Sequence, residues 1–99
     1  MARPARLGDA DVAARLKALP GWSLAAGKLH KVFTFADFVD AWRFMSGVAL
    51  AAETMGHHPD WSNVWNRVTV DLTTHDAGGL TALDFDLAAR MEALAGPRP

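Results

Sequence analysis

The sequence contains no cysteine among its 99 residues. Disulfide bonds and thiolate zinc sites are therefore excluded, while the redox compartment stays open. The chain also has no large excess of either charge, since its formal net charge is -1 with histidine neutral. Proteins that bind nucleic acid usually present a strongly basic face, so this balance argues against a nucleic-acid partner.

Long uncharged apolar runs are missing as well. The longest apolar segment, residues 35–55, is interrupted by two aspartates, an arginine and a glutamate. A membrane span would not tolerate that many charges. The first nine residues carry arginines but no apolar run follows them, so no secretory signal is expected. We therefore expect a cytoplasmic protein without a membrane segment.

The composition is that of a globular protein, with 51% hydrophobic and 21% charged residues. A chain of this length has room for one hydrophobic core, so residues 1–99 are expected to form a single domain. The sequence shows no internal repeat and no low-complexity segment.

Hydrophobic periodicity and turn residues predict helix, two strands, helix, two strands, helix. The expected elements are a helix capped by Asp9, a hairpin of residues 22–24 and 29–33, a helix of residues 35–55, strands within residues 57–65 and 67–74, and a helix of residues 82–95. Thr34 and Thr81 are the expected caps of the two long helices. This order predicts an α+β fold, a two-layer sandwich in which helices pack on one face of a four-stranded, mainly antiparallel sheet.

The first long helix should bury a broad apolar sector. Its members are Phe38, Ala41, Trp42, Met45, Val48, Ala49, Ala52 and Met55. Phe33 and Phe38 are placed to form a hydrophobic staple. Val39 and Leu50 lie outside the sector, either as scattered exposed residues or as part of an oligomer contact.

Three of the four histidines gather in one part of the sequence. His57 and His58 lie where the long helix ends, directly before Pro59, and His75 follows the last strand. If the two strands between them pair antiparallel, the end of the second lies beside the start of the first. That pairing predicts that His75 approaches His57 and His58.

Two carboxylates bracket these histidines, Glu53 on the last turn of one helix and Asp84 on the first turn of the next. Histidine exchanges protons near neutral pH, and a neighbouring carboxylate orients its ring. The pattern therefore indicates a pocket suited to acid–base chemistry.

Each residue also has a structural interpretation. A histidine at a helix end can interact with the helix dipole, Asp84 can complete a capping box with Thr81, and Glu53 can be a solvated helix residue. Trp61 can pack in the core or form the floor of a pocket for a flat ligand. Three histidines with a carboxylate could hold zinc, but adjacent residues in an extended chain diverge and no HExxH helix is present, so no metal site is expected.

At these residues the sequence resembles the pterin-4a-carbinolamine dehydratase family, also known as the dimerisation cofactor of a homeodomain transcription factor. The resemblance lies in a spaced set of residues, namely Glu53, His57, His58, Pro59, Trp65, Thr74, His75, Gly79, Leu80 and Asp84. The upstream segments LPGW and KVFTFADFVDAWRFM are also similar to the family, so the resemblance covers nearly the whole chain.

The resemblance implies an α+β fold and an enzyme that dehydrates 4a-hydroxytetrahydropterin to quinonoid dihydropterin, which a reductase recycles. The pterin would be the substrate, and no metal or organic cofactor would be needed. The implied catalytic residues are His57, His58 and His75, with Glu53, Pro59, Trp61, Thr74 and Asp84 binding or orienting.

The resemblance also implies a homo-oligomer, either a dimer or a tetramer. The alternative is a non-catalytic protein-binding or assembly factor on the same fold. Nothing in the sequence indicates a homeodomain partner. A pure scaffold has no physical need for three clustered imidazoles, which favours the enzyme.

Overall fold

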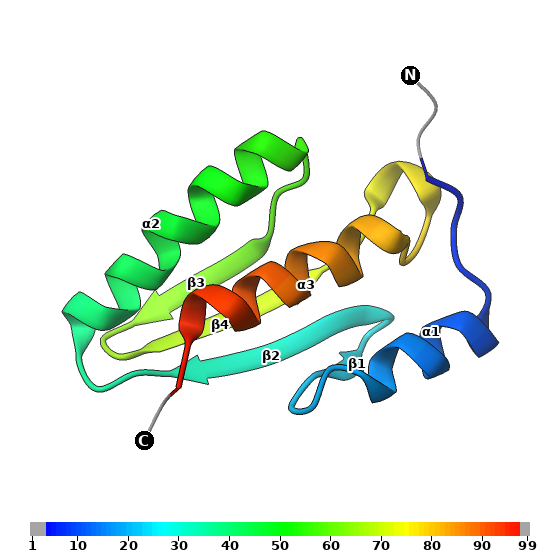
Figure 1. The fold of residues 1–99 in the computed structure, drawn as a ribbon. Coiled ribbons are helices and arrows are strands. Elements are labelled where there is room, and N and C mark those ends of the chain that lie inside the picture. Colours follow the sequence, from blue (N-terminus) through cyan, green and yellow to red (C-terminus); the bar gives the residue numbers. More distant parts are fainter. Residues whose placement is uncertain (1–3, 98–99) are drawn as a thin grey trace.

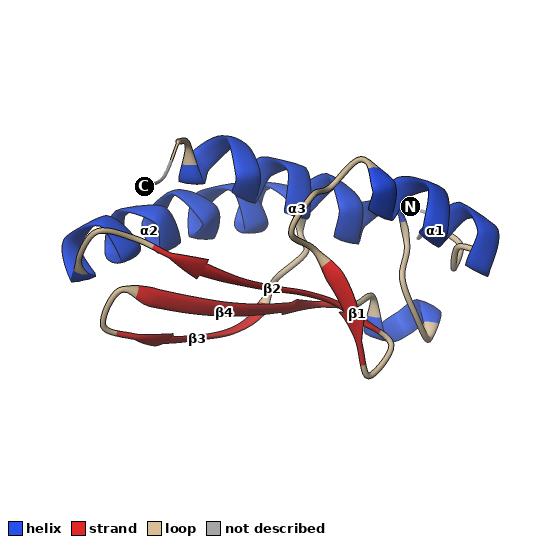
Figure 2. Ribbon diagram, turned by 90° about the horizontal axis from the view of Figure 1, so that it is seen from below, coloured by secondary structure: helices blue, strands red, loops and turns tan. Residues whose placement is uncertain are grey.

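The computed structural model describes residues 4–97. In chain order their elements are α1 (Asp9–Lys17), β1 (Ser23–Ala25), β2 (Lys28–Thr34), α2 (Phe38–Met55), β3 (Asp60–Val64), β4 (Arg67–Leu72), the 3-10 helix η1 (His75–Ala77) and α3 (Ala82–Ala95). The strands form one sheet in the order β1-β2-β4-β3, and every pairing is antiparallel. The α-helices lie on one side of this sheet and leave its other face uncovered by helices (Figures 1 and 2). The predicted α+β architecture is confirmed.

The sheet buries one face because its strands alternate as predicted. In β4 the side chains of Val68, Val70 and Leu72 are fully buried, while Arg67 is exposed. Residues with a period of two share one face of a strand, so these three point at the helices. No helix within residues 4–97 is long and apolar enough to cross a membrane.

Helix α2 begins three residues later than predicted, and Asp37 rather than Thr34 caps it. The Asp37 Oδ1 atom accepts the Asp40 N–H at 2.8 Å. Phe35 stays outside the helix because its backbone is tied to the β3–β4 turn. Its N–H donates to the Asn66 carbonyl at 2.9 Å, and the Asn66 side chain donates back to its carbonyl at 2.9 Å.

The buried face of α2 also differs from the expected one. Phe44 is 3% exposed and packs against the rings of Phe33 and Phe35, whereas Phe38 and Trp42 are 47% and 57% exposed. The buried side chains of α2 are Ala41, Phe44, Val48, Ala51 and Ala52. The expected sector was therefore wrong at Phe38, Trp42 and Ala49, all of which are exposed. The expected Phe33–Phe38 staple is replaced by stacking of Phe33 on Phe35.

The ends of the other helices bear on the site. Asp9 is the first residue of α1, which has Gly8 rather than Asp9 at its cap position. Helix α3 begins after Thr81 and spans Ala82–Ala95, as predicted. Its start lies at the same end of the sheet as the loop after α2, which brings two segments distant in sequence together.

Candidate functional site

The end of α2 directs one of the adjacent histidines inward. Gly56 adopts a left-handed conformation with φ of 63°, and the His57 N–H reaches back to the Ala52 carbonyl at 3.0 Å. A left-handed residue with such a hydrogen bond is a common helix C-cap, and glycine adopts this conformation without strain. It turns the chain so that His57 is 7% exposed, while the neighbouring His58 points to solvent.

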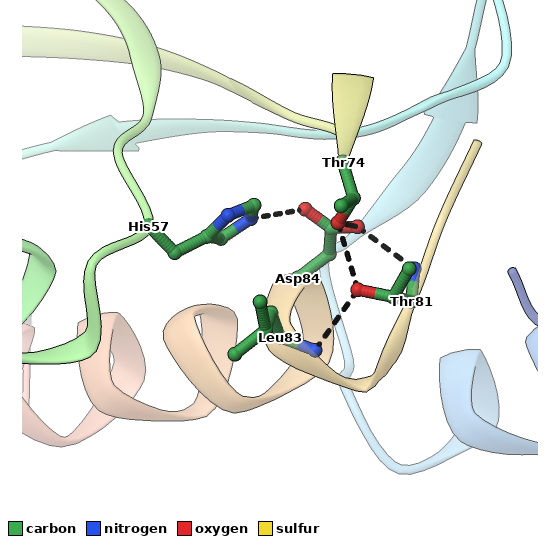
Figure 3. Close-up of polar contacts among 5 residues, drawn as sticks. All are labelled: His57, Thr74, Thr81, Leu83 and Asp84. Atoms are coloured by element: carbon green, nitrogen blue, oxygen red, sulfur yellow. Dashed lines mark hydrogen bonds and ion pairs between the residues drawn. The ribbon is translucent and has the colours of Figure 1, made fainter. Parts of the chain in front are cut away.

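The ring of His57 meets Asp84, which is fully buried on the first turn of α3 (Figure 3). The His57 Nε2 atom lies 2.6 Å from Asp84 Oδ1. The second carboxylate oxygen, Oδ2, accepts the Thr74 hydroxyl at 2.8 Å and the Thr81 N–H at 2.9 Å. The two threonine hydroxyl oxygens are 2.7 Å apart. A buried carboxylate is thus satisfied by three donors from three segments of the chain.

The hydrogen bonds fix which atom carries each proton. The single hydroxyl hydrogen of Thr74 is used on Asp84, so the hydrogen between the two threonines must come from Thr81. The Thr81 oxygen in turn accepts the Leu83 N–H at 3.2 Å. Every hydrogen in this chain of bonds points toward Asp84. A carboxylate only accepts, so His57 donates from Nε2, and its Nδ1 atom is the one left for a proton transfer.

Asp84 has a structural role together with its contact to His57. Its side chain accepts the Thr81 N–H, and Thr81 and Asp84 form a complete capping box at the start of α3. The structural and the functional interpretations of this residue therefore coexist. The capping box holds the carboxylate in place through Oδ2, and the other oxygen, Oδ1, faces the imidazole of His57.

His58 and Glu53 form a second, exposed pair. The His58 Nε2 atom lies 2.7 Å from Glu53 Oε1, with side chains 62% and 81% exposed. Solvent screens such a pair, so it contributes little to stability. The contact instead gives the His58 ring a preferred orientation at the rim of the site.

His75 stands on a tight loop held at its two ends. Thr74 and Gly79 form an isolated antiparallel bridge, with the Thr74 N–H donating to the Gly79 carbonyl at 3.1 Å. Within the loop the Gly78 N–H donates to the His75 carbonyl at 3.0 Å. The backbone is thus fixed while the His75 side chain stays exposed, an arrangement that suits a reacting group.

The three histidines line one open hollow of about 280 Å³, which we call the histidine hollow. Its lining consists of Gly56, His57, His58, Thr73, Thr74, His75 and Asp76. Glu53 reaches the hollow only through His58, and Asp84 lies behind His57 and Thr74.

Two of the expected residues and the fourth histidine lie outside this lining. Pro59 and Trp61 are not part of the lining, and Trp61 is half-buried against the core, which agrees with its packing interpretation. The fourth histidine, His30, lies outside the hollow and pairs with Asp71 at 2.9 Å.

Sequence reasoning missed two kinds of contribution to the site. Thr81 was expected only as a helix cap, yet its hydroxyl also lies 2.7 Å from that of Thr74. Thr73 and Asp76 were not singled out and line the hollow. Their position next to His75 at the end of a strand was the available signal.

Within the described part of the chain, no group of three histidine or acidic side chains is arranged to hold a metal ion. The geometry explains this. The Nε2 atoms of His57 and His58 point to different carboxylates, Asp84 and Glu53, so the adjacent rings diverge.

The comparisons with known proteins identify the family of the chain. Residues 5–94 match the family model described as Pterin 4 alpha carbinolamine dehydratase. The chain belongs to the pterin-4a-carbinolamine dehydratase family. It is 52% identical over 90 residues to a protein of Solibacter usitatus that is provisionally named pterin-4-alpha-carbinolamine dehydratase, covering 91% of this chain and 95% of that one. A Rhizobium johnstonii protein with the same provisional name is 55% identical, with 88% of each chain covered.

Two solved structures extend the likeness to the fold. A transcriptional coactivator/pterin dehydratase from Brucella melitensis superposes with a TM-score of 0.89 at 43% identity, covering 92% of this chain and 99% of that one. A pterin dehydratase-like protein described as a RuBisCO assembly factor in the alpha-carboxysome superposes with a TM-score of 0.63 at 26% identity. The match covers 76% of this chain and 87% of that one.

Proposed function

We propose that this protein dehydrates 4a-hydroxytetrahydropterin to quinonoid dihydropterin and water, and so supports the recycling of tetrahydropterin. The observation that carries the proposal is that three imidazoles line one hollow, one of them held by a buried carboxylate. Membership of the dehydratase family supports the choice of substrate.

The reaction breaks the bond between C4a and its hydroxyl group and forms a double bond between C4a and N5. The leaving hydroxyl takes a proton from an acid and departs as water, while a base removes the proton from N5. The reaction is redox-neutral and consists of proton transfers and loss of water. The proposal therefore includes no metal and no organic cofactor.

His57 and His75 are the residues that we propose to divide these two tasks. Asp84 fixes the Nε2–H tautomer of His57, which makes Nδ1 the exchanging atom, and it stabilises the charged ring that forms when Nδ1 takes up a proton. His75 contributes an exposed ring from the opposite segment of the same hollow. His58, oriented by Glu53, completes the set at the rim and is proposed to bind the pterin and to relay protons.

A non-catalytic assembly role is the second candidate, and the likeness to the structure described as a RuBisCO assembly factor favours it. The two candidates differ in what they need. An assembly factor needs a surface that binds its partner. The buried Asp84–His57 pair and the threonine hydroxyls behind it instead orient one imidazole ring, which an acid–base catalyst requires.

Self-association is part of the proposal. The outer face of α2 exposes Phe38, Val39, Trp42 and Leu50, with Leu50 at 74%. Large apolar side chains gathered on one helix are typical of a surface that another chain covers. We expect a dimer or tetramer by sedimentation velocity at micromolar concentration, shifted toward smaller species by Leu50→Glu. A wild-type monomer would contradict this part of the proposal.

Stopped-flow ultraviolet absorbance tests the activity. Enzymatically generated 4a-hydroxytetrahydropterin is mixed with buffer or with this protein, and the appearance of the quinonoid form is followed. Acceleration that is proportional to protein concentration supports the dehydratase. Decay at the spontaneous rate supports the assembly role instead.

A further inference from the structure

A second hollow of about 470 Å³ adjoins the histidine hollow. Thr73 and His75 line both, so the two hollows lie next to each other at the His75 loop. The remaining lining of this second hollow comes from the N-terminal segment, the start of α1, the β1–β2 hairpin and residues 78–80. Neither the family resemblance nor the reaction assigned it a role.

The chemistry of the substrate places a group there. N5 must lie beside a histidine to lose its proton, and in the pterin ring the atom bonded to N5 on the side away from C4a is C6. The substituent that distinguishes one natural pterin from another is carried on C6. It therefore leaves the ring at the reacting edge, next to the histidines. Because His75 lines both hollows, a ring held against His75 in the first places its C6 substituent next to the second.

The second hollow carries two cationic side chains, Arg6 and Lys28, and one carboxylate, Asp9. Lys28 pairs only loosely with Asp60, at 3.7 Å between Nζ and Oδ2 and with the Asp60 side chain 78% exposed. No carboxylate within residues 4–97 forms an ion pair with Arg6. A guanidinium in this position offers several N–H donors to an oxyanion.

Arg6 is held against the loop that carries His75. The Leu7 N–H donates to the Leu80 carbonyl at 2.8 Å, which fixes the N-terminal segment alongside residues 78–80 (Figure 1). A Cβ atom added at Gly79 would lie 2.7 Å from Arg6 Nε, so the arginine side chain rests directly on that glycine. The Arg6 guanidinium is therefore held in a defined position beside the loop that carries His75.

We infer that the second hollow receives the C6 substituent of the pterin and that Arg6 and Lys28 select substituents that carry an anionic group, a phosphate or a carboxylate. This inference rests on the proposed function and deepens it by naming the substrate class. Charge-assisted hydrogen bonds are the strong ones, so one such contact gives a preference of about tenfold over the neutral analogue.

Binding measurements by titration calorimetry test the inference with three probes: 7,8-dihydroneopterin, its 3′-monophosphate and 7,8-dihydropterin-6-carboxylate. We expect the wild type to bind at least one anionic probe about tenfold more tightly than dihydroneopterin, with a preference that falls as salt rises. The probe that shows the preference tells which anion is selected. Equal affinity for all three probes would overturn the inference.

Variants locate the effect. Arg6→Gln and Lys28→Gln should each lower the ratio of anionic to neutral affinity. Gly79→Ala should do so as well by displacing Arg6 while keeping its charge. Arg43→Gln removes an exposed arginine of α2 outside both hollows and should leave the ratio at the wild-type value. A ratio unchanged in all three subsite variants would overturn the assignment of these residues.

The stopped-flow assay with a neutral 4a-hydroxytetrahydropterin distinguishes failure of the proposed dehydratase function from failure of the assignment of the second hollow. Accelerated dehydration without any anion preference leaves the proposed function standing and overturns this inference alone. Neither acceleration nor binding of any probe overturns both.

Discussion

His57 and Asp84 lie 27 residues apart in the sequence, and their Nε2 and Oδ1 atoms are 2.6 Å apart. The contact joins the loop after α2 to the first turn of α3 and is buried on both sides. It links the fold to the proposed chemistry, because the carboxylate that completes the capping box of α3 also sets the proton position of the His57 imidazole in the loop after α2.

Asp84→Asn tests this contact. An asparagine whose carbonyl oxygen accepts from Thr81 turns its NH₂ group toward His57, and His57 must then accept at Nε2 and carry its hydrogen on Nδ1. We expect turnover to fall by about 10²- to 10⁴-fold, the usual contribution of a positioned acid or base. Stability should fall by about 1–3 kcal/mol in urea unfolding, because a charge-assisted network is weakened.

Asp86→Asn is the matched control, since Asp86 is exposed on the same helix, outside the network. It should leave rate and stability unchanged. Wild-type turnover in Asp84→Asn would show that the tautomer of His57 has no part in catalysis.

Thr74→Val tests the hydroxyl chain behind the carboxylate. Valine keeps the shape of threonine but removes the donor to Asp84 Oδ2 and leaves the Thr81 hydroxyl without its acceptor. Each buried polar group left unsatisfied costs about 1–3 kcal/mol, so the midpoint of urea unfolding should fall clearly. Thr74→Ser keeps the hydroxyl and should retain most of the stability. Equal unfolding midpoints for the valine and serine variants would contradict the hydrogen-bond assignment.

Gly56→Ala tests the left-handed C-cap of α2 that turns His57 inward. The position has a φ of 63°, and a Cβ atom there would meet nothing within 4 Å, so the cost is conformational only. We expect a loss of about 1 kcal/mol of unfolding free energy. Gly56→Asn is the comparison, because asparagine tolerates the left-handed conformation better than alanine and should lose less stability. If the alanine and asparagine variants unfold alike, the left-handed turn does not limit stability.

The fold was largely readable from the sequence where local signals and burial agree. The alternation of Val68, Val70 and Leu72 and the cap at Thr81 predicted β4 and the start of α3. The start of α2 was not readable, because the backbone of Phe35 is held by Asn66, 31 residues away. No local pattern reports such a contact.

The candidate site divides in the same way. The antiparallel pairing of β3 and β4 was enough to expect His75 near His57 and His58, and all three line one hollow. The bond between His57 and Asp84 depends on how two helix ends meet, and the adjoining hollow depends on where the N-terminal segment lies. Both follow from tertiary packing rather than from spacing.

The most direct test of the central claim is the stopped-flow dehydration rate of His75→Ala beside the wild type. The His75 side chain is exposed, so its loss should change the free energy of unfolding by no more than about 0.5 kcal/mol. Turnover should nevertheless fall about 100-fold or more. His30→Ala removes the one histidine outside the hollow and should keep the wild-type rate. A folded His75→Ala protein that dehydrates the pterin at the wild-type rate would contradict the account.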